Sequence, residues 1–431
     1  MKPWILSRKS MKLKLIALLF VCVLLLTSCQ PDYSALPETY QENVDSAYSF
    51  ISNSTLAPFV TPAENGYYTM IGRYIYYVDK ETLQAVPLCN KPECAHSQET
   101  EDERIFSCNA FVFTERSPFL QYYDGKLYTI GQCSDENGRS FHALIRISPD
   151  GINREYLCRI ENPENISFTL HRGYLYRYPK NVGGDVSRCP INRLSDNAYE
   201  TVISVDESMV YSSIVCKGSK VYYTGLSEEN RTVLYSYDTK SRETVKVIVS
   251  ESSYDFLNVY RDMLIYYAID KQSGAADYIA FDPETGKTID FLDDVFFEKD
   301  KNINVYSDGI NLHITKVVPL EGTERRTVLP QITIVKPEKD VDSFSGKELA
   351  QIVNSGANTL YMDEMFPLDM HFGMAGGDEK YLFVGSVGNA WEIVTLDMID
   401  KETLEISRVI DLEGSAVYPP TSTLPYVPGV K

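Results

Sequence analysis

The chain has 431 residues, of which 44% are hydrophobic and 12% aromatic, so it is long and apolar enough to bury a large core. It carries 41 Lys and Arg residues against 60 Asp and Glu residues, which gives a formal net charge of −19. This acidic balance excludes nucleic acid and anionic lipid as electrostatic partners, because both require a basic surface.

The first 28 residues predict a targeting peptide that is not part of the fold. Five basic residues and no acidic one accompany an apolar run of 12 residues, Leu15–Leu26, which is short for a permanent membrane helix. The run ends in Leu26-Thr27-Ser28-Cys29, which resembles the bacterial lipobox. This resemblance implies that Cys29 carries fatty-acid chains, becomes the mature N-terminus and holds the protein on the extracytoplasmic face of the cell membrane. The alternatives are an uncleaved anchor and an ordinary secretory signal.

Residues 29–55 predict a flexible linker between the lipid and the globular body, because they are polar, acidic and without clear apolar periodicity. Cleavage would remove the five basic residues of the leader, so 36 Lys and Arg residues would remain against 60 acidic ones. A solvated surface accounts for this charge without a charged ligand. We expect the globular body at residues 56–412 and a Pro-rich tail at 413–431.

One pattern occurs seven times between residues 65 and 384: a polar or glycine-containing turn, followed by a strand that is mostly rich in tyrosine. The turns are Asn65-Gly66, Asp124-Gly125, Arg172-Gly173, Lys217-Gly218, Arg261-Asp262, Asp308-Gly309 and Gly377-Asp378. Four of the six spacings between them lie at 44 to 48 residues. A period of this length with all-β units is typical of propeller blades. We therefore predict an all-β fold, a seven-bladed β-propeller; six or eight blades remain open if an insertion hides or mimics a blade.

The unit is clearest in the fifth repeat, where we expect four strands at 256–260, 263–269, 277–281 and 287–292. The last two flank Asp282-Pro283-Glu284-Thr285-Gly286, whose aspartate, proline and glycine favour a tight turn. Residues 56–62 and 406–412 can supply the first and last strands of the ring. The ring then closes without a shared strand, and the tail at 418–431 covers the junction.

The repeated tyrosines alternate with aliphatic residues, as strands that are half-buried between blades require. Because they recur at the same blade position, packing accounts for them better than a sugar-binding platform does. The tyrosines concerned are Tyr67, Tyr68, Tyr76, Tyr77, Tyr222, Tyr223, Tyr266 and Tyr267.

Two insertions interrupt the period, at residues 89–111 and 338–370. In the second, the apolar spacing of Gly346–Asn354 predicts one short helix. The first brings four candidate metal ligands into 20 residues: Cys89, Cys94, His96 and Cys108. Three thiols and one imidazole form a suitable donor set for tetrahedral zinc.

Three interpretations of this cluster stay open. We favour a disulfide between two of the three cysteines, which an extracytoplasmic location permits. The second is a structural zinc bound by all four residues, although Cys-x4-Cys-x-His is not a usual finger or ribbon spacing. The third is a set of free thiols on a partner-binding loop. A catalytic zinc is the least expected, because four protein ligands leave no open coordination position.

The repeats resemble those of a group of bacterial, Firmicutes-type β-propeller lipoproteins with the form Asp-Gly-x-(Ile/Val/Leu)-Tyr-Tyr. The resemblance covers about residues 56–412. An insertion of the form Leu-Cys-x-Lys-x-x-Cys-x-His … Cys-Asn-Ala, found here at 88–110, recurs after the first blade of those proteins. The resemblance implies the fold and says almost nothing about activity.

The chain contains no nucleophile elbow, zinc-protease helix, Walker loop or dinucleotide fingerprint. Outside the insertion its histidines occur singly, and adjacent carboxylates are expected by chance among 60 acidic residues. We therefore expect a membrane-tethered binding or scaffold lipoprotein without a catalytic site, whose partner is an envelope protein or glycan. One alternative is an envelope enzyme that acts on carbohydrate or peptide with carboxylates in the propeller channel. Another is a zinc-stabilised envelope sensor or assembly factor.

Overall fold

The computed structural model describes residues 33–46, 60–96, 101–114, 119–161, 166–179, 185–194, 198–204, 214–226, 231–250, 253–261, 263–269, 276–292, 303–319, 328–335, 351, 355, 359–361, 371–387, 393–412 and 424–427. The chain divides into two compact units, Met1–Leu36 and Pro37–Lys431. The described part of the first unit is a short 3₁₀ helix, η1 (Tyr33–Ala35), followed by Leu36. The predicted leader at 1–28 and Cys29 lie outside the described residues. No helix in the described part of the chain is long and apolar enough to cross a membrane.

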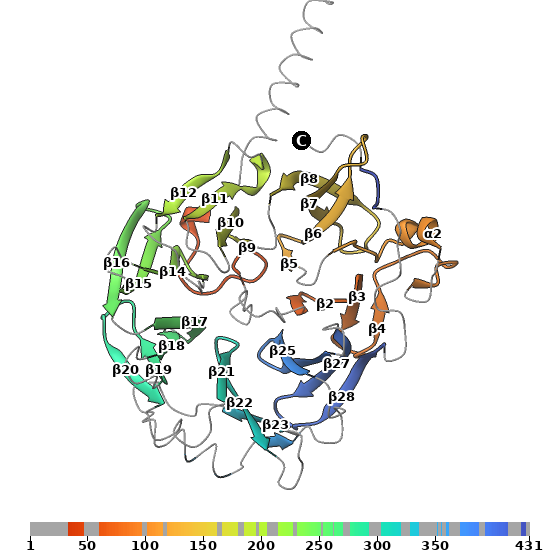
Figure 1. Ribbon diagram of the computed structural model, residues 1–431. Helices are drawn as coiled ribbons and strands as arrows, with labels where there is room; N and C mark the ends of the chain where they lie inside the picture. Colours follow the sequence, from red (N-terminus) through yellow and green to blue (C-terminus); the bar gives the residue numbers. More distant parts are fainter. Residues whose placement is uncertain are drawn as a thin grey trace, which may run out of the picture. The chain divides into compact units, whose positions relative to one another are not determined.

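The second unit contains seven four-stranded antiparallel sheets arranged in a ring, a seven-bladed β-propeller (Figure 1). Blades one and two comprise β1 (Val60–Ala63), β2 (Gly66–Ile71), β3 (Tyr74–Asp79), β4 (Ala85–Pro87), β5 (Leu120–Tyr123), β6 (Lys126–Ser134), β7 (Ser140–Ile147) and β8 (Arg154–Ile160). Blades three and four comprise β9 (Ile166–His171), β10 (Tyr174–Pro179), β11 (Val186–Pro190), β12 (Glu200–Ile203), β13 (Ile214–Lys217), β14 (Lys220–Leu226), β15 (Thr232–Asp238) and β16 (Glu243–Ser250). Blades five to seven comprise β17 (Ser253–Tyr260), β18 (Met263–Ile269), β19 (Ala276–Phe281), β20 (Thr288–Leu292), β21 (Ile303–Ser307), β22 (Leu312–Pro319), β23 (Val328–Val335), β24 (Thr359–Tyr361), β25 (His371–Gly377), β26 (Tyr381–Val387), β27 (Ile393–Asp400) and β28 (Ile406–Asp411). The predicted fold and blade number are confirmed. The remaining named elements are α2 (Asp102–Ser107) and a 3₁₀ turn, η4 (Ile191–Arg193).

Strands within a blade differ according to their neighbours. In blade four, β15 lies between two strands and reads TVLYSYD, with every residue but the last buried. Its neighbour β16 is the outer edge and reads ETVKVIVS, with its first four residues exposed. A central strand covered on both sides needs a nearly continuous apolar run. Charged residues on the edge strand, such as Glu243 and Lys246, disfavour pairing with another chain.

The strands follow chain order in every sheet, and each blade contains its own first and fourth strand. The ring therefore closes without a shared strand, as predicted. Side chains join the first and last blades: the Tyr67 ring meets the Phe383 ring edge-on with centroids 4.7 Å apart. The Tyr67 hydroxyl donates a hydrogen bond to Oδ2 of Asp378 at 2.6 Å.

Because consecutive strands run antiparallel, the turns between first and second strands and between third and fourth strands lie on the same side of each blade. We call this side the turn face. At Asp124-Gly125 the backbone φ angles are 46° and 68°, and at Arg172-Gly173 they are 42° and 84°. Two consecutive positive φ angles in a two-residue hairpin are the type I′ geometry, which matches the twist of paired strands.

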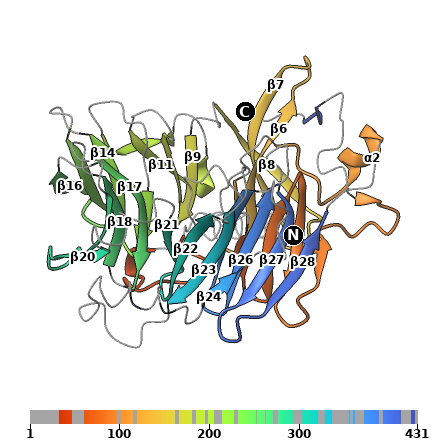
Figure 2. The same ribbon diagram turned by 60° about the horizontal axis from the view of Figure 1, so that its bottom comes forward.

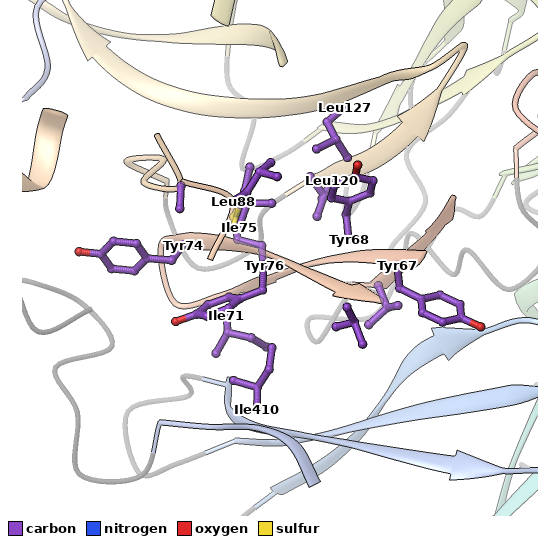
Figure 3. Close-up of a cluster of buried hydrophobic side chains, with 14 of the residues drawn as sticks. Tyr67, Tyr68, Ile71, Tyr74, Ile75, Tyr76, Leu88, Leu120, Leu127 and Ile410 are labelled. Carbon is purple, nitrogen blue, oxygen red and sulfur yellow. The ribbon is translucent and has the colours of Figure 1, made fainter. Parts of the chain in front are cut away.

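Most of the repeated tyrosines are packing residues, as predicted. Tyr67, Tyr68, Tyr76, Tyr222, Tyr223 and Tyr266 are buried. Tyr77 is half-buried, and the side chain of Tyr267 lies outside the described part of the structure. In blade one the buried tyrosines belong to a cluster that also includes Leu120 and Leu127 of blade two and Ile410 of blade seven (Figure 3). Neighbouring blades thus share one core.

The structure corrects two predicted boundaries. The stretch at 338–370 is not wholly an insertion, because β24 (Thr359–Tyr361) is the fourth strand of blade six and pairs with β23. The predicted helix at 346–354 falls almost entirely outside the described residues. Residues 424–427 of the tail do not cover the junction of blades seven and one. They lie along β6 of blade two, where Tyr426 pairs with Ser134 and Val427 contacts Cys133.

Candidate functional site

Residues Pro37–Ser46, which we call the strap, are held against the turn face of blades two to four (Figure 1, red, beside β9 and β14). The Asp124 N–H donates to the carbonyl of Asn43 at 2.7 Å, and the Arg172 N–H donates to the carbonyl of Val44 at 2.7 Å. The prediction of a flexible linker over residues 29–55 is therefore wrong for residues 37–46. The N–H groups of the blade turns thus supply hydrogen-bond partners for the backbone carbonyls of the strap.

A buried ion pair fixes the C-terminal end of the strap. Nε of Arg172 donates to Oδ1 of Asp45 at 2.7 Å and Nη2 donates to Oδ2 at 3.2 Å, with 4% and 1% of the two side chains exposed. The neighbouring imidazole of His171 accepts the Ser46 N–H at Nδ1 and donates from Nε2 to the carbonyl of Gly218. Burial lowers the pKa of His171, so this neutral tautomer is the stable form.

The N-terminal end of the strap is fixed by Glu38. Its carboxylate accepts the Ser219 N–H at 2.7 Å and lies 2.5 Å from Nζ of Lys240. Partial burial raises the pKa of Glu38, but the bonds from Lys240 and Ser219 outweigh it and bring the pKa down to about 2. Gly218 has a φ of +56°, and a Cβ there would lie 2.7 Å from the carbonyl oxygen of Glu38. Glycine is thus required both by the turn and by the approach of the strap.

A cavity of about 500 Å³ opens between the strap and the turn ends of blades one, two, six and seven. Its lining includes Tyr40, Glu42, Asp45, Lys80, Tyr122, Asp308, Asp378, Glu379 and Lys380. This is the region in which an enzyme of the channel type would need free catalytic carboxylates.

Three of the cavity carboxylates are engaged in structural contacts. Asp45 pairs with Arg172, Asp378 accepts the Tyr67 hydroxyl, and Asp308 forms a buried ion pair with Lys401. Burial raises the pKa of Asp308, but the nearby His313 and Lys401 outweigh it, so the pKa lies below its usual value. A glycosidase requires one carboxylic acid with a raised pKa. Asp308, with its lowered pKa, does not meet that requirement.

The four predicted metal ligands converge at the outer edge of blade one. Cys89 follows β4, Cys94 and His96 lie in the next loop, and Cys108 ends α2, which stands outside the ring (Figures 1 and 2). Their ligand atoms all lie within 4.8 Å of one another. Sγ of Cys108 is 3.7 Å from Nδ1 of His96.

The insertion leaves and rejoins the edge of blade one. The Leu88 N–H donates to the carbonyl of Ile75, and the Ile75 N–H donates in turn to the carbonyl of Ala110. The Val112 N–H then donates to the carbonyl of Arg73. Both ends of the insertion are thus hydrogen-bonded to the same stretch, residues 73–75 at the start of β3, along the outer edge of the blade.

No disulfide joins these cysteines: Cys89, Cys94 and Cys108 are all free. The disulfide that we favoured from the sequence is absent from the structure and stays a prediction for the oxidised protein. The three sulfur atoms and one imidazole nitrogen instead lie together as one cluster, all within 4.8 Å of one another. Cys133, Cys158, Cys189 and Cys216 are buried in the blades, as expected for packing residues.

The surroundings of the cluster carry N–H donors and cations. Burial raises the pKa of Cys89, but hydrogen bonds from the N–H groups of Lys91 and Asn109 outweigh it, and the pKa lies below its usual value. Nζ of Lys91 donates to the carbonyl of Ser107, and Nη2 of Arg154 donates to the carbonyl of Asn109. The donors stabilise a thiolate and tie the two arms of the insertion together.

No protein-family model matches the chain, and no curated protein matches it. Several solved structures are similar. A prolyl endopeptidase is 10% identical with a TM-score of 0.48, and the match covers 85% of this chain and 50% of that chain. The propeller domain of the Trilobed protease from Pyrococcus furiosus is 12% identical with a TM-score of 0.41, over 68% and 83% of the two chains. An oligogalacturonate lyase from Vibrio parahaemolyticus is 10% identical with a TM-score of 0.42, over 81% and 87%.

The chain thus spans about half the length of the prolyl endopeptidase that it matches. At such identities the similarity concerns the fold alone. The seven four-stranded sheets by themselves define the chain as a β-propeller protein.

Proposed function

We propose that this chain is a lipid-anchored binding platform on the extracytoplasmic face of a cell membrane. The observation that supports the proposal is the docked strap, which turns a loose tether into a short one attached at a defined side of the propeller. The lipid on Cys29 supplies the membrane attachment, and the propeller supplies the surface that binds a partner.

The reach of the tether follows from chain length. From Cys29 to Pro37 there are eight residue steps, which extend about 28 Å at most. A linker that stayed free as far as residue 55 would reach more than three times as far. The platform is therefore held close to the bilayer with its turn face on the membrane side. The opposite face, with the tip of the β6–β7 hairpin at 134–140 and the tail at Tyr426, is the one left open to a partner.

The charge of the chain supports a lipid anchor. With 60 acidic residues, the protein is repelled by an anionic bilayer and gains nothing from electrostatic adsorption. Two or three acyl chains hold a protein firmly, since each buried methylene contributes about 0.8 kcal/mol. The partner we propose is an envelope protein or glycan bound by connecting loops, because loops on a rigid scaffold are the usual binding elements of such folds.

The anchor is tested by fractionation. The wild-type chain should appear in the membrane fraction and incorporate a labelled fatty acid, and a Cys29→Ala variant should do neither. A Cys22→Ala variant is the matched control and should behave as wild type. Equal membrane association of the Cys29→Ala variant without label would refute the lipid anchor.

Partner binding is tested by cross-linking in intact cells, followed by purification of the chain from detergent-solubilised envelope. Recovery of one protein or glycan by the wild-type chain, reduced when residues 134–140 are replaced by a Gly-Ser turn, would support binding through the open face. Repeated recovery of nothing above the level of an unrelated lipoprotein would count against a binding function.

A further inference from the structure

We propose that Cys89, Cys94, His96 and Cys108 bind one structural Zn²⁺ ion that fixes the insertion to the edge of blade one. This proposal is independent of the lipid anchor and of any partner. It stands on four observations: the convergence of the ligand atoms, the backbone of His96, the charges around the cluster and the lack of buried apolar side chains in the loop at residues 91–96.

The donor set and its spacing fit zinc. Three sulfur atoms and one imidazole nitrogen lie within 4.8 Å of one another. In a tetrahedral site the Zn–S bonds are about 2.3 Å and the Zn–N bond about 2.0 Å, so the ligand atoms stand roughly 3.5–3.8 Å apart. Small side-chain rotations bring the four atoms to that separation. Soft thiolates with one imidazole select zinc over hard cations, which prefer oxygen ligands.

The backbone of His96 is in the left-handed region, with a φ of +52°. Histidine tolerates this conformation better than most residues with a side chain, and a fixed local contact stabilises it further. Here the conformation directs Nδ1 toward the sulfur of Cys108, 3.7 Å away. A metal bond would supply such a contact.

The charges also match. Zinc with three thiolates and a neutral imidazole carries a net charge of −1. Arg154 of β8 interacts electrostatically with Cys108 and donates to the carbonyl of Asn109. Its Nε is buried, and no hydrogen bond reaches that atom within the described part of the chain. A guanidinium whose Nε is removed from solvent is stabilised by a nearby negative charge, and the zinc–thiolate centre would provide one.

The second half of the insertion packs into the core of blade one through Ile105, Cys108, Ala110 and Phe111, so the cross-link matters most for the loop at residues 91–96. α2 has six residues, of which only Ile105 is buried, and a helix of this length is unstable alone. The ends of the excursion are held by β3, but the stretch around Cys94 and His96 has no buried apolar side chain among its described residues. All four coordination positions are filled by the protein, so the ion would be structural rather than catalytic.

The first test uses the full mature chain purified without chelator. Elemental analysis should find one zinc per chain, and replacement by Co²⁺ should give the visible bands of a tetrahedral site with thiolate charge transfer. Copper or iron at one per chain with no zinc would overturn the choice of metal. A disulfide between any two of Cys89, Cys94 and Cys108 in the native protein, found by mass spectrometry, would overturn the site.

Variants separate the site from general folding. Cys94→Ser and His96→Ala should lose at least 90% of the metal, whereas His96→Cys should retain it because a fourth thiolate is an acceptable ligand. Cys216→Ser, which removes a buried thiol in blade four, should keep one zinc per chain. Full zinc content in Cys94→Ser would refute the assignment. Loss of zinc in both Cys216→Ser and Cys94→Ser would also refute it, because the metal would then report the fold and not these ligands.

Discussion

The strap and the Cys/His insertion are two segments outside the blades that are fixed in opposite ways. The strap has hardly any apolar side chain in the core, and a buried ion pair and capped carboxylate attach it to the turn face. The insertion returns to its blade edge through backbone hydrogen bonds, and soft ligands gather at its centre. The strap depends on polar contacts to become ordered, whereas Ile105, Cys108 and Phe111 of the insertion also join the core of blade one. The two segments should respond to different conditions: the strap to charge and pH, and the insertion, through the proposed zinc site, to metal and oxidation.

The largest effect should come from Arg172→Ala, which leaves the carboxylate of Asp45 buried without its partner. Removing one member of a buried ion pair costs about 3–5 kcal/mol. We expect the strap to detach, which amide hydrogen exchange at residues 38–46 and chemical denaturation would detect. Arg261→Ala is the matched control, because Arg261 occupies the same turn in blade five with a φ of +52° and its guanidinium lies 5.8 Å from the Tyr260 ring. A loss of stability equal to that of Arg261→Ala would show that the buried carboxylate of Asp45 does not need Arg172.

The second effect concerns the insertion and should leave the strap unchanged. Arg154→Ala removes the cation beside the proposed zinc centre, and loss of such an outer partner weakens metal binding about 10–100-fold. Arg154→Lys should restore part of that affinity. The measurement is competition for Zn²⁺ with a chromophoric chelator at a fixed ionic strength. An unchanged affinity in Arg154→Ala would remove Arg154 from the metal site.

A smaller effect separates turn strain from strap contact. Gly218→Ala and Gly125→Ala both place a side chain at positive φ, +56° and +68°, which costs about 1–2 kcal/mol. At Gly125 a Cβ meets nothing within 4 Å, whereas at Gly218 it meets Glu38. Gly218→Ala should therefore be the more destabilising in urea unfolding and should alone increase hydrogen exchange in the strap. Equal effects would mean that Glu38 moves aside at no cost.

The smallest effect is a pH dependence confined to the strap. The pKa of Glu38 falls from 4.5 to about 2 on docking. A carboxyl group whose pKa is lower in the docked state stabilises that state above pH 4.5. This stabilisation is lost as the pH falls from 4.5 to 2. Because Glu38 is largely exposed, we expect only about 1 kcal/mol. Exchange of the strap amides measured from pH 5 to pH 2.5 should change less in Glu38→Gln than in wild type, and parallel curves would exclude Glu38 as the titrating group.

The blades were predictable because the sequence signals that define them, a turn followed by a tyrosine-rich strand, are local and occur seven times. Each turn at the start of a repeat, such as Asp124-Gly125, sits beside its own strands, and the tyrosines mark the buried positions. The ligand cluster was predictable as a set of residues, since all four lie within 20 positions. The chemical state of the cluster was not predictable, because spacing along the chain does not distinguish a disulfide from a set of thiols gathered at one site.

The strap was missed because its partners are distant in sequence. Asp45 pairs with a residue 127 positions away, and Ser219, which binds Glu38, is 181 positions away. A short acidic stretch has the same composition whether it is free or docked, so composition predicted disorder. The only local sign of the docking site was the presence of Gly218 and Arg172 in blade turns. Such residues also recur in other blade turns, so they did not indicate a docked segment. The short strand β24 was missed for the opposite reason, since three residues are too few to show alternation.

The position of the strap decides how the ring bears mechanical load. Tension applied to the N-terminal end of the chain reaches blades three and four first, through Arg172 and Ser219, before it reaches β1. β1 lies at the junction of blades one and seven, which are not consecutive in the chain and which side chains such as Tyr67 hold together. The strap therefore transfers the tension to blades three and four, which the chain connects to both of their neighbours. The junction of blades one and seven, where the two ends of the propeller meet, carries less of the load.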